Sequence, residues 1–287
     1  MGVNLEIQQV PVAAGPPTAD RRNLEMPNRV QTTRHEPPRK VGPPFGDINY
    51  VNGRTARTRD RCRRCEVSAN CVLASGDFQA FERFLPKMDQ ILLERDQVLY
   101  LEGDPARHVH AISEGALKLY KTLRDGRNQV VGFAFPGDFV DFPFGELHDV
   151  NAEAVIATRV CRLPRSELHQ LCERSPRLEE KFREIAVHEI TFAHGQMLLL
   201  GRKTASERIA SFLLMMSGVS RRLGNGADGI FIPMARVDIA DYLGLTVETV
   251  SRTLSRMKSD RLIDIPDIHH VVLRDIGAIN DLAEGED

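Results

Sequence analysis

The 287-residue sequence has no apolar run close to the roughly 18 residues that a membrane-spanning helix requires. Its first residues, M-G-V-N-L-E-I, lack the basic and then apolar pattern of a signal peptide. The net charge is only −2, so nucleic-acid binding would depend on where Arg and Lys are placed and not on bulk charge. We therefore expect a cytoplasmic protein without a membrane partner, with about two domains for this length.

The motifs of common enzymes are also missing. The sequence contains no Gly-rich phosphate loop, no nucleophile elbow and no metallohydrolase motif. Its histidines are scattered and form no pattern that indicates a catalytic group. We predict that the protein is not an enzyme.

Residues 1–60 contain few apolar side chains, and these show no sustained period. Half of the sixteen prolines fall in this segment. Such a segment cannot bury enough surface to offset the entropy lost on ordering it. We predict a disordered, proline-rich tail and assign it no function.

Cysteine is scarce, with five residues in all, and the odd number argues against a disulfide framework. Three of them form a C-x2-C-x5-C array: Cys62, Cys65 and Cys71. Thiolates at this spacing bind zinc or an iron–sulfur cluster, and a fourth ligand must come from Cys161, Cys172 or a histidine. The alternative is a set of redox-active or incidental thiols. No second close Cys or His pair is present, which favours iron–sulfur over zinc.

Short apolar segments follow one another up to Pro164. Turn-forming residues separate them at similar intervals: Gly103-Asp104, Glu114-Gly115, Asp125-Gly126 and Pro136-Gly137. This pattern predicts an all-β barrel or roll.

A long helix is predicted to start at Pro176, a residue suited to a first helical turn. Residues that alternate by four and three along it indicate a coiled-coil seam and a dimer interface. These residues are Leu178, Phe182, Ile185, Glu189, Phe192, Gln196 and Leu199. The alternative is a helix whose apolar face packs on its own β domain.

The stretch Val237–Leu262 contains two short helical patterns with a turn between them. Gly244 ends the first, because glycine tolerates a left-handed turn, and Thr246 is a good N-cap for the second. A helix, a short turn with Gly and a second helix indicate a helix-turn-helix. The segment Ile263–Leu273 reads as a β-hairpin, which would make the arrangement winged.

The second helix carries its polar side chains opposite its apolar stripe. Glu248, Ser251 and Arg252 project from its first half, and Arg256 follows one turn later. Arg can bind guanine with two hydrogen bonds, Glu can accept from cytosine, and Ser can contact a base edge or a phosphate. The alternative is a helical hairpin with a solvated charged face. We predict a DNA-binding face made of Thr246, Glu248, Ser251, Arg252 and Arg256.

These features in this order resemble the CRP/FNR superfamily of bacterial transcription regulators, and within it the FNR (fumarate and nitrate reduction) branch. The motifs that carry the resemblance are D-Y-L-G-L-T-V-E-T-V-S-R at 241–252, A-S-E-R-I-A-S-F-L at 205–213, P-G-D-F at 136–139 and F-G-E-L at 144–147. The cysteine array matches that of the FNR branch.

The resemblance implies an α+β protein with four parts. They are the tail at 1–60, the cysteine array plus a β-roll sensor domain of the cyclic-nucleotide-binding type at 61–174, a dimerisation helix at 175–201 and a winged helix-turn-helix domain at 202–287. It also implies a [4Fe–4S] cluster whose fourth ligand is Cys161, beside Cys62, Cys65 and Cys71. Cys172 is then expected to be a buried free cysteine.

The implied function is an oxygen-responsive regulator of genes for low-oxygen metabolism. As a homodimer it would bind inverted repeats of TTGAT-type half-sites, and exposed loops such as Leu123–Asn128 would contact RNA polymerase. This chain has Ala193 and His194 where the branch commonly places an acidic residue near the subunit seam. We therefore expect its cluster-free form to dimerise more readily than its relatives do.

Two rivals within the superfamily differ in the signal. A cyclic-nucleotide receptor needs an Arg soon after its Gly-Glu pair, but no Arg or Lys follows Gly145-Glu146 before Arg159. We therefore expect no cyclic nucleotide. The second rival is a zinc-stabilised or thiol-redox regulator without an iron–sulfur cluster.

Overall fold

The computed structural model describes residues 65, 71, 87–140, 145–224 and 229–285, and all of them belong to one unit, Phe45–Asp287. The predicted disordered tail, residues 1–60, lies outside the described residues, as does Cys62. Among the helices that are described, none is long and apolar enough to cross a membrane.

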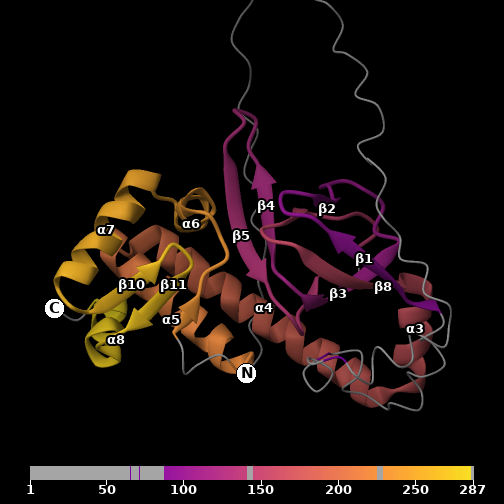
Figure 1. Ribbon diagram of the computed structural model, residues 1–287. Helices are drawn as coiled ribbons and strands as arrows, with labels where there is room; N and C mark the ends of the chain where they lie inside the picture. Colours follow the sequence, from indigo (N-terminus) through magenta and orange to yellow (C-terminus); the bar gives the residue numbers. More distant parts are fainter. Residues whose placement is uncertain (1–64, 66–70, 72–86, 141–144, 225–228, 286–287) are drawn as a thin grey trace, which may run out of the picture. The chain divides into compact units, whose positions relative to one another are not determined.

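The strands of the first half form two antiparallel sheets, each of four strands within the described residues (Figure 1). One sheet has the order β1 (Asp89–Leu93), β8 (Thr158–Pro164), β3 (His108–Glu114) and β6 (Phe139–Val140). The other has the order β2 (Val98–Tyr100), β7 (Asn151–Ala154), β4 (Leu117–Thr122) and β5 (Asn128–Ala134). The predicted β-roll is thus confirmed.

Apolar side chains on the inner faces of the two sheets form the core of the β-roll. Leu93, Ile112, Leu117, Ala152 and Val160 are all 2% exposed or less. The alternation of buried and less buried residues along β5 is that of a strand with one face on a core.

The turn between β3 and β4 requires glycine. Gly115 has a φ of +87°, and a Cβ atom there would lie 2.5 Å from the carbonyl oxygen of Ala157. The hydroxyl of Thr158 fills the same corner, where it accepts the N–H of Ala116 at 3.1 Å. The close approach of these backbones joins the two sheets.

Two helices follow the β-roll, α3 (Arg165–Arg174) and α4 (Pro176–Arg202), so the long helix begins at Pro176 as predicted. The first half of α4 covers one end of the β-roll. Leu178 and Phe182 are buried there with Val109 of β3, Leu163 of β8 and Leu168 of α3.

The predicted dimer seam on α4 faces the chain's own domains. Phe182 and Leu199 are buried, and Ile185, Phe192 and Gln196 are half-buried against the β-roll core or the DNA-binding core. Of that set only Glu189 is exposed. The assignment of this face to a partner helix needs correction, since intrachain packing already occupies its apolar positions.

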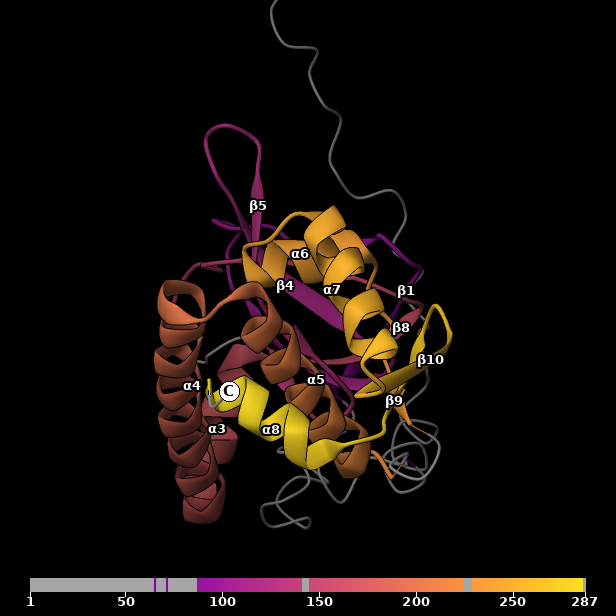
Figure 2. The same cartoon turned by 90° about the vertical axis from the view of Figure 1, so that its left-hand side faces the viewer.

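The second half of the described chain is a helical domain with a small sheet. It contains α5 (Ala205–Arg222), β9 (Ile230–Phe231), α6 (Arg236–Leu243), α7 (Val247–Ser259), β10 (Ile263–Asp267), β11 (His270–Leu273) and α8 (Ile276–Glu284). The strands pair in the order β10-β11-β9, and β10 with β11 forms the predicted wing hairpin. The winged helix-turn-helix is therefore confirmed, with α6 beside α7 (Figure 2).

Replacing Gly115 with Ala should destabilise the β-roll, because the new Cβ clashes with backbone atoms in addition to the strain of a positive φ. We expect the free energy of unfolding to fall by about 2–4 kcal/mol in chemical denaturation. Gly126→Ala is the matched control, since Gly126 has a φ of +85° but nothing within 4 Å of its Cβ position. Its loss should be about 1 kcal/mol, and equal losses for both variants would contradict the steric argument.

Candidate DNA interface and cysteine site

The turn of the helix-turn-helix has the predicted geometry. Gly244 ends α6 with a φ of +61°, in the left-handed region. Thr246 caps α7, because its hydroxyl oxygen accepts the N–H of Thr249 at 3.2 Å. The apolar stripe of α7, Val250, Leu254 and Met257, is 3% exposed or less and fixes the helix on its domain.

The opposite side of α7 is open to solvent. All five residues predicted to contact DNA are exposed: Thr246, Glu248, Ser251, Arg252 and Arg256. No ion pair or hydrogen bond within the described residues involves the side chain of Glu248 or of Arg252. Both groups are therefore available to base edges, and their role in DNA binding stays a prediction.

Cations around the end of α7 and the wing are already paired with carboxylates. Arg256 lies 3.6 Å from Asp260, while Lys258 and Arg274 lie 3.6 and 3.1 Å from Asp264. Asp264 has a lowered pKa, mainly because Arg274 donates a hydrogen bond to it. These pairs reduce the net positive charge that this surface presents.

A half-buried ion cluster joins the β-roll to the start of α6. The ammonium group of Lys118 on β4 lies 2.9 Å from Glu153 of β7 and 3.0 Å from Asp238 of α6. Burial lowers the pKa of Lys118, but the hydrogen bonds to the two carboxylates outweigh it and hold that pKa above its usual value. Asp238 also accepts the N–H of Ala235, so the same carboxylate caps α6.

Other contacts join the same two domains. Arg222 at the end of α5 forms a two-pronged ion pair with Asp138, the aspartate of the P-G-D-F motif. The ring of Phe133 on β5 lies 5.3 Å from that of Tyr242 on α6. Sequence reasoning missed these residues, since Lys118 and Asp238 are 120 positions apart and no local pattern links them.

The described cysteines of the predicted cluster site gather at one end of the β-roll. Cys161 lies in β8, and the amide of Gln90 on β1 donates to its sulfur at 3.6 Å. Burial raises the pKa of the Cys161 thiol, and a smaller contribution in the same direction comes from Cys65. Cys71 packs against the apolar cluster of β3, β8, α3 and α4 that also contacts Cys161.

Cys62, the remaining predicted ligand, lies outside the described residues. Among the described residues no group of three or more His, Cys, Asp or Glu side chains is spaced to hold a metal ion. All four described cysteines are free thiols. The structure thus places Cys65 and Cys71 in the region of Cys161, and the described part of the chain contains three of the four predicted ligands.

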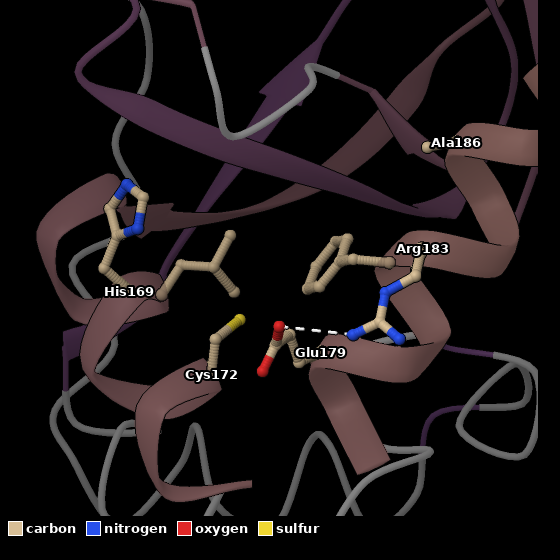
Figure 3. Close-up of a pocket in the computed structure, with 7 residues that line it drawn as sticks. His169, Cys172, Glu179, Arg183 and Ala186 are labelled. Carbon is tan, nitrogen blue, oxygen red and sulfur yellow. Dashed lines mark hydrogen bonds and ion pairs between the residues drawn. The ribbon is translucent and has the colours of Figure 1, made fainter. Parts of the chain in front are cut away.

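Cys172 is half-buried, where the sequence predicted a buried residue. It points into a cavity of about 200 Å³ between α3 and α4, toward Glu179 (Figure 3). Burial raises the pKa of this thiol, and the charge of Glu179 raises it further. Cys172 is therefore only half-buried, because it lines this cavity together with Leu168 and Phe182.

Two family models match these domains. The model of the cyclic nucleotide-binding domain matches residues 90–175, and the model of the Crp-like helix-turn-helix domain matches residues 207–282. Together they cover the β-roll with α3 and the winged helix-turn-helix.

Among curated relatives, the nitrogen fixation regulation protein FixK of Bradyrhizobium diazoefficiens is 35% identical over 204 residues, which cover 71% of this chain and 86% of FixK. The transcriptional activator protein Anr of Pseudomonas aeruginosa is 34% identical over 209 residues, which cover 70% of this chain and 84% of Anr. The solved structure of FixK2 from Bradyrhizobium japonicum is 38% identical, with a TM-score of 0.64, and covers 68% of this chain and 96% of that chain.

The matching domains lie in the order that the fold shows, and the matched regions cover most of the length of each relative. The recognition helix, its cap and its exposed polar face are those of a DNA-binding helix-turn-helix regulator. The chain belongs to the CRP/FNR family of transcription regulators.

Proposed function

We propose that this chain is an oxygen-responsive transcription regulator that holds a [4Fe–4S] cluster and binds TTGAT-type inverted repeats as a homodimer. The genes it controls would serve low-oxygen metabolism. The observation that supports the proposal is that Cys65 acts electrostatically on Cys161, a residue 96 positions later, and that Cys71 packs against the same apolar cluster as Cys161. Thiolates are the donors that iron–sulfur clusters take in proteins.

In this proposal Cys62, Cys65, Cys71 and Cys161 hold the cluster. When bound, it would supply an oxygen-labile tie between the N-terminal cysteines and β8. Cys71 and Cys161 contact the apolar cluster that contains Phe182 and borders Ile185. A displacement of the cysteine side chains would therefore alter the packing of α4, because close-packed side chains transmit displacement.

The dimer interface would lie on the outer face of α4. Val187, Ile190, Met197 and Leu198 are 58–63% exposed there. Val187, Ile190, His194, Met197 and Gly201 are spaced by three and four, which is the a/d spacing of a coiled coil. At 3.6 residues per turn this stripe lies about 150° around the helix from the predicted seam.

We propose that α4 of a second copy of the chain packs on this stripe. Exposed apolar side chains in a continuous line cost free energy in water, and a parallel copy would cover them. No acidic residue occurs at the five stripe positions, and His194 stands near their centre. The cluster-free protein should therefore dimerise at micromolar concentration, and sedimentation that showed only monomer would count against this.

Each subunit would present one α7 to one half-site. Two linked readers bind a palindrome far more tightly than one, since the second contact is made at high effective concentration. The β4–β5 hairpin tip, with Leu123 47% exposed, is the proposed contact for RNA polymerase.

The second candidate is a zinc-stabilised or thiol-redox regulator without an iron–sulfur cluster. Zinc takes the same thiolate donors as an iron–sulfur cluster, and the four described cysteines are free thiols. An anaerobic gel shift on a TTGAT-type palindrome, repeated after exposure to air, tests the main proposal. Binding that air abolishes supports it; a colourless protein with stoichiometric zinc and air-stable binding supports the second candidate.

Replacing Cys161 with Ser should remove the broad absorption near 400 nm and the bound iron of anaerobically reconstituted protein, because a ligand is lost. Cys172→Ser is the matched control, and it should keep both signals. Loss of the chromophore in Cys172→Ser with retention in Cys161→Ser would reassign the fourth ligand to Cys172.

Replacing Ile190 with Glu should weaken the dimer, because it places two like charges in an apolar seam. We expect the monomer–dimer dissociation constant to rise about 100-fold or more in sedimentation equilibrium. His188→Glu adds the same side chain at an exposed position of α4 outside the stripe and should leave that constant nearly unchanged. Equal effects would place the interface elsewhere.

Replacing Arg252 with Ala should cost about 1–3 kcal/mol per half-site and relax discrimination at one base pair. Anisotropy titrations on the palindrome, on single-base variants and on random DNA measure both effects. Arg256→Ala is the comparison, since Arg256 already pairs with Asp260. The loss of affinity of Arg256→Ala should be smaller and equal on all three DNAs. If Arg252→Ala also lost affinity equally on all three, Arg252 would be a phosphate contact.

A further inference from the structure

The last carbonyl groups of α6 are bound by side chains from outside the helix-turn-helix. A helix leaves its final carbonyls without partners in its own ladder, and they must find others. Ala240 accepts the N–H of Leu245 at 3.0 Å, which is the backbone solution. The next three carbonyls, those of Asp241, Tyr242 and Leu243, each accept from a side chain.

Three different elements supply the donors. Gln129 of β5 donates to the carbonyl of Asp241 at 2.7 Å, and Gln196 of α4 donates to that of Tyr242 at 3.3 Å. Arg208 of α5 donates to that of Leu243 at 2.8 Å. We name Gln129, Gln196 and Arg208 the carbonyl clamp. Its members thus come from the β-roll, from the long helix α4 and from α5, the helix that precedes the helix-turn-helix.

Arg208 binds more than α6. Its other nitrogens donate to the carbonyls of Leu200 at 3.0 Å and Lys203 at 2.8 Å, at the end of α4. One guanidinium group therefore joins the last turn of α4 to the turn that precedes α7. A positive group at helix C-termini is favourable because the partial charge there is negative.

The turn at Gly244 packs closely against Arg208 and the last turn of α4. A Cβ atom at Gly244 would lie 3.3 Å from the side chain of Leu200 and 3.4 Å from Arg208. Only two residues separate Gly244 from α7, whose cap is Thr246. The placement of the turn thus sets the direction of the recognition helix.

The β-roll holds both ends of α6. Lys118 pairs with Asp238 in the first turn, and Gln129 binds the last turn, with β5 and α6 side by side (Figure 2). Water could satisfy the end carbonyls of an independent DNA-binding domain. Donors from β5 and α4 instead make the orientation of α7 depend on the sensor domain and on the long helix.

We propose that the carbonyl clamp consists of positioning residues for DNA binding. They set the angle and spacing of the two recognition helices in the dimer, and they leave each helix able to read its half-site alone. The inference rests on the proposed dimeric reading of an inverted repeat. It assigns a role in binding to three residues that do not touch DNA.

Gln129→Met in the full-length, cluster-loaded protein tests the clamp under anaerobic conditions, since it keeps side-chain length and removes the N–H donors. Affinity is measured by anisotropy on a TTGAT palindrome and on the same duplex with one half-site scrambled. We expect a loss of about fivefold or more on the palindrome and little change on the single half-site. Gln97→Met is the matched control in the same domain, where Gln97 accepts the N–H of Glu94, and it should change neither affinity.

Arg208→Lys gives a second variant that keeps the charge but cannot span carbonyls on both α4 and α6, and it should show the same palindrome-selective loss. Thermal unfolding checks that both variants are folded. Equal losses on the two duplexes would overturn the proposal, because they would mean damage to α7 itself. Unchanged affinity on both would also overturn it. Wild-type protein with no preference for the palindrome would instead contradict the proposed dimeric function.

Discussion

The apolar side of α4 is shared between two cores, and the other parts of the molecule depend on that packing. Leu178 and Phe182 lie under the β-roll near the cysteines, while Leu199 is buried with α5 and the helix-turn-helix. A single rigid helix of 27 residues therefore contacts both the proposed cluster region and the DNA-binding domain. Its outer side remains available to a second copy.

The β-roll also contacts the helix-turn-helix domain directly, without involving α4. Lys118 and Gln129 bind α6, and Asp138 binds Arg222 of α5. Removal of Lys118 would leave the carboxylates of Glu153 and Asp238 without their cation at half-buried positions, which is costlier than the pairing is stabilising. Such contacts favour one arrangement of the domains over its alternatives.

Local patterns in the sequence predicted the helix-turn-helix correctly. The apolar period of α7, the cap at Thr246 and the left-handed Gly244 are all consequences of neighbouring residues, and the structure has each of them. The dimer face was harder, since α4 carries two stripes with three-and-four spacing. Which stripe is covered depends on residues far away, such as Val109 and Leu163, that no local period reveals. The same holds for Gln129, whose partner lies 112 positions later, and for the cavity that exposes Cys172.

The carboxylates beside Arg256, Lys258 and Arg274 have a consequence for the ionic strength at which the protein works. Binding to DNA releases the counterions of the phosphates that protein cations neutralise, and the loss of affinity with salt measures how many are released. Cations that are already neutralised by Asp260 and Asp264 release fewer of these counterions when the protein binds DNA. A net charge of −2 acts in the same direction. We therefore expect a low affinity for random DNA at physiological salt, so that binding to an operator would depend mainly on the proposed base contacts of α7.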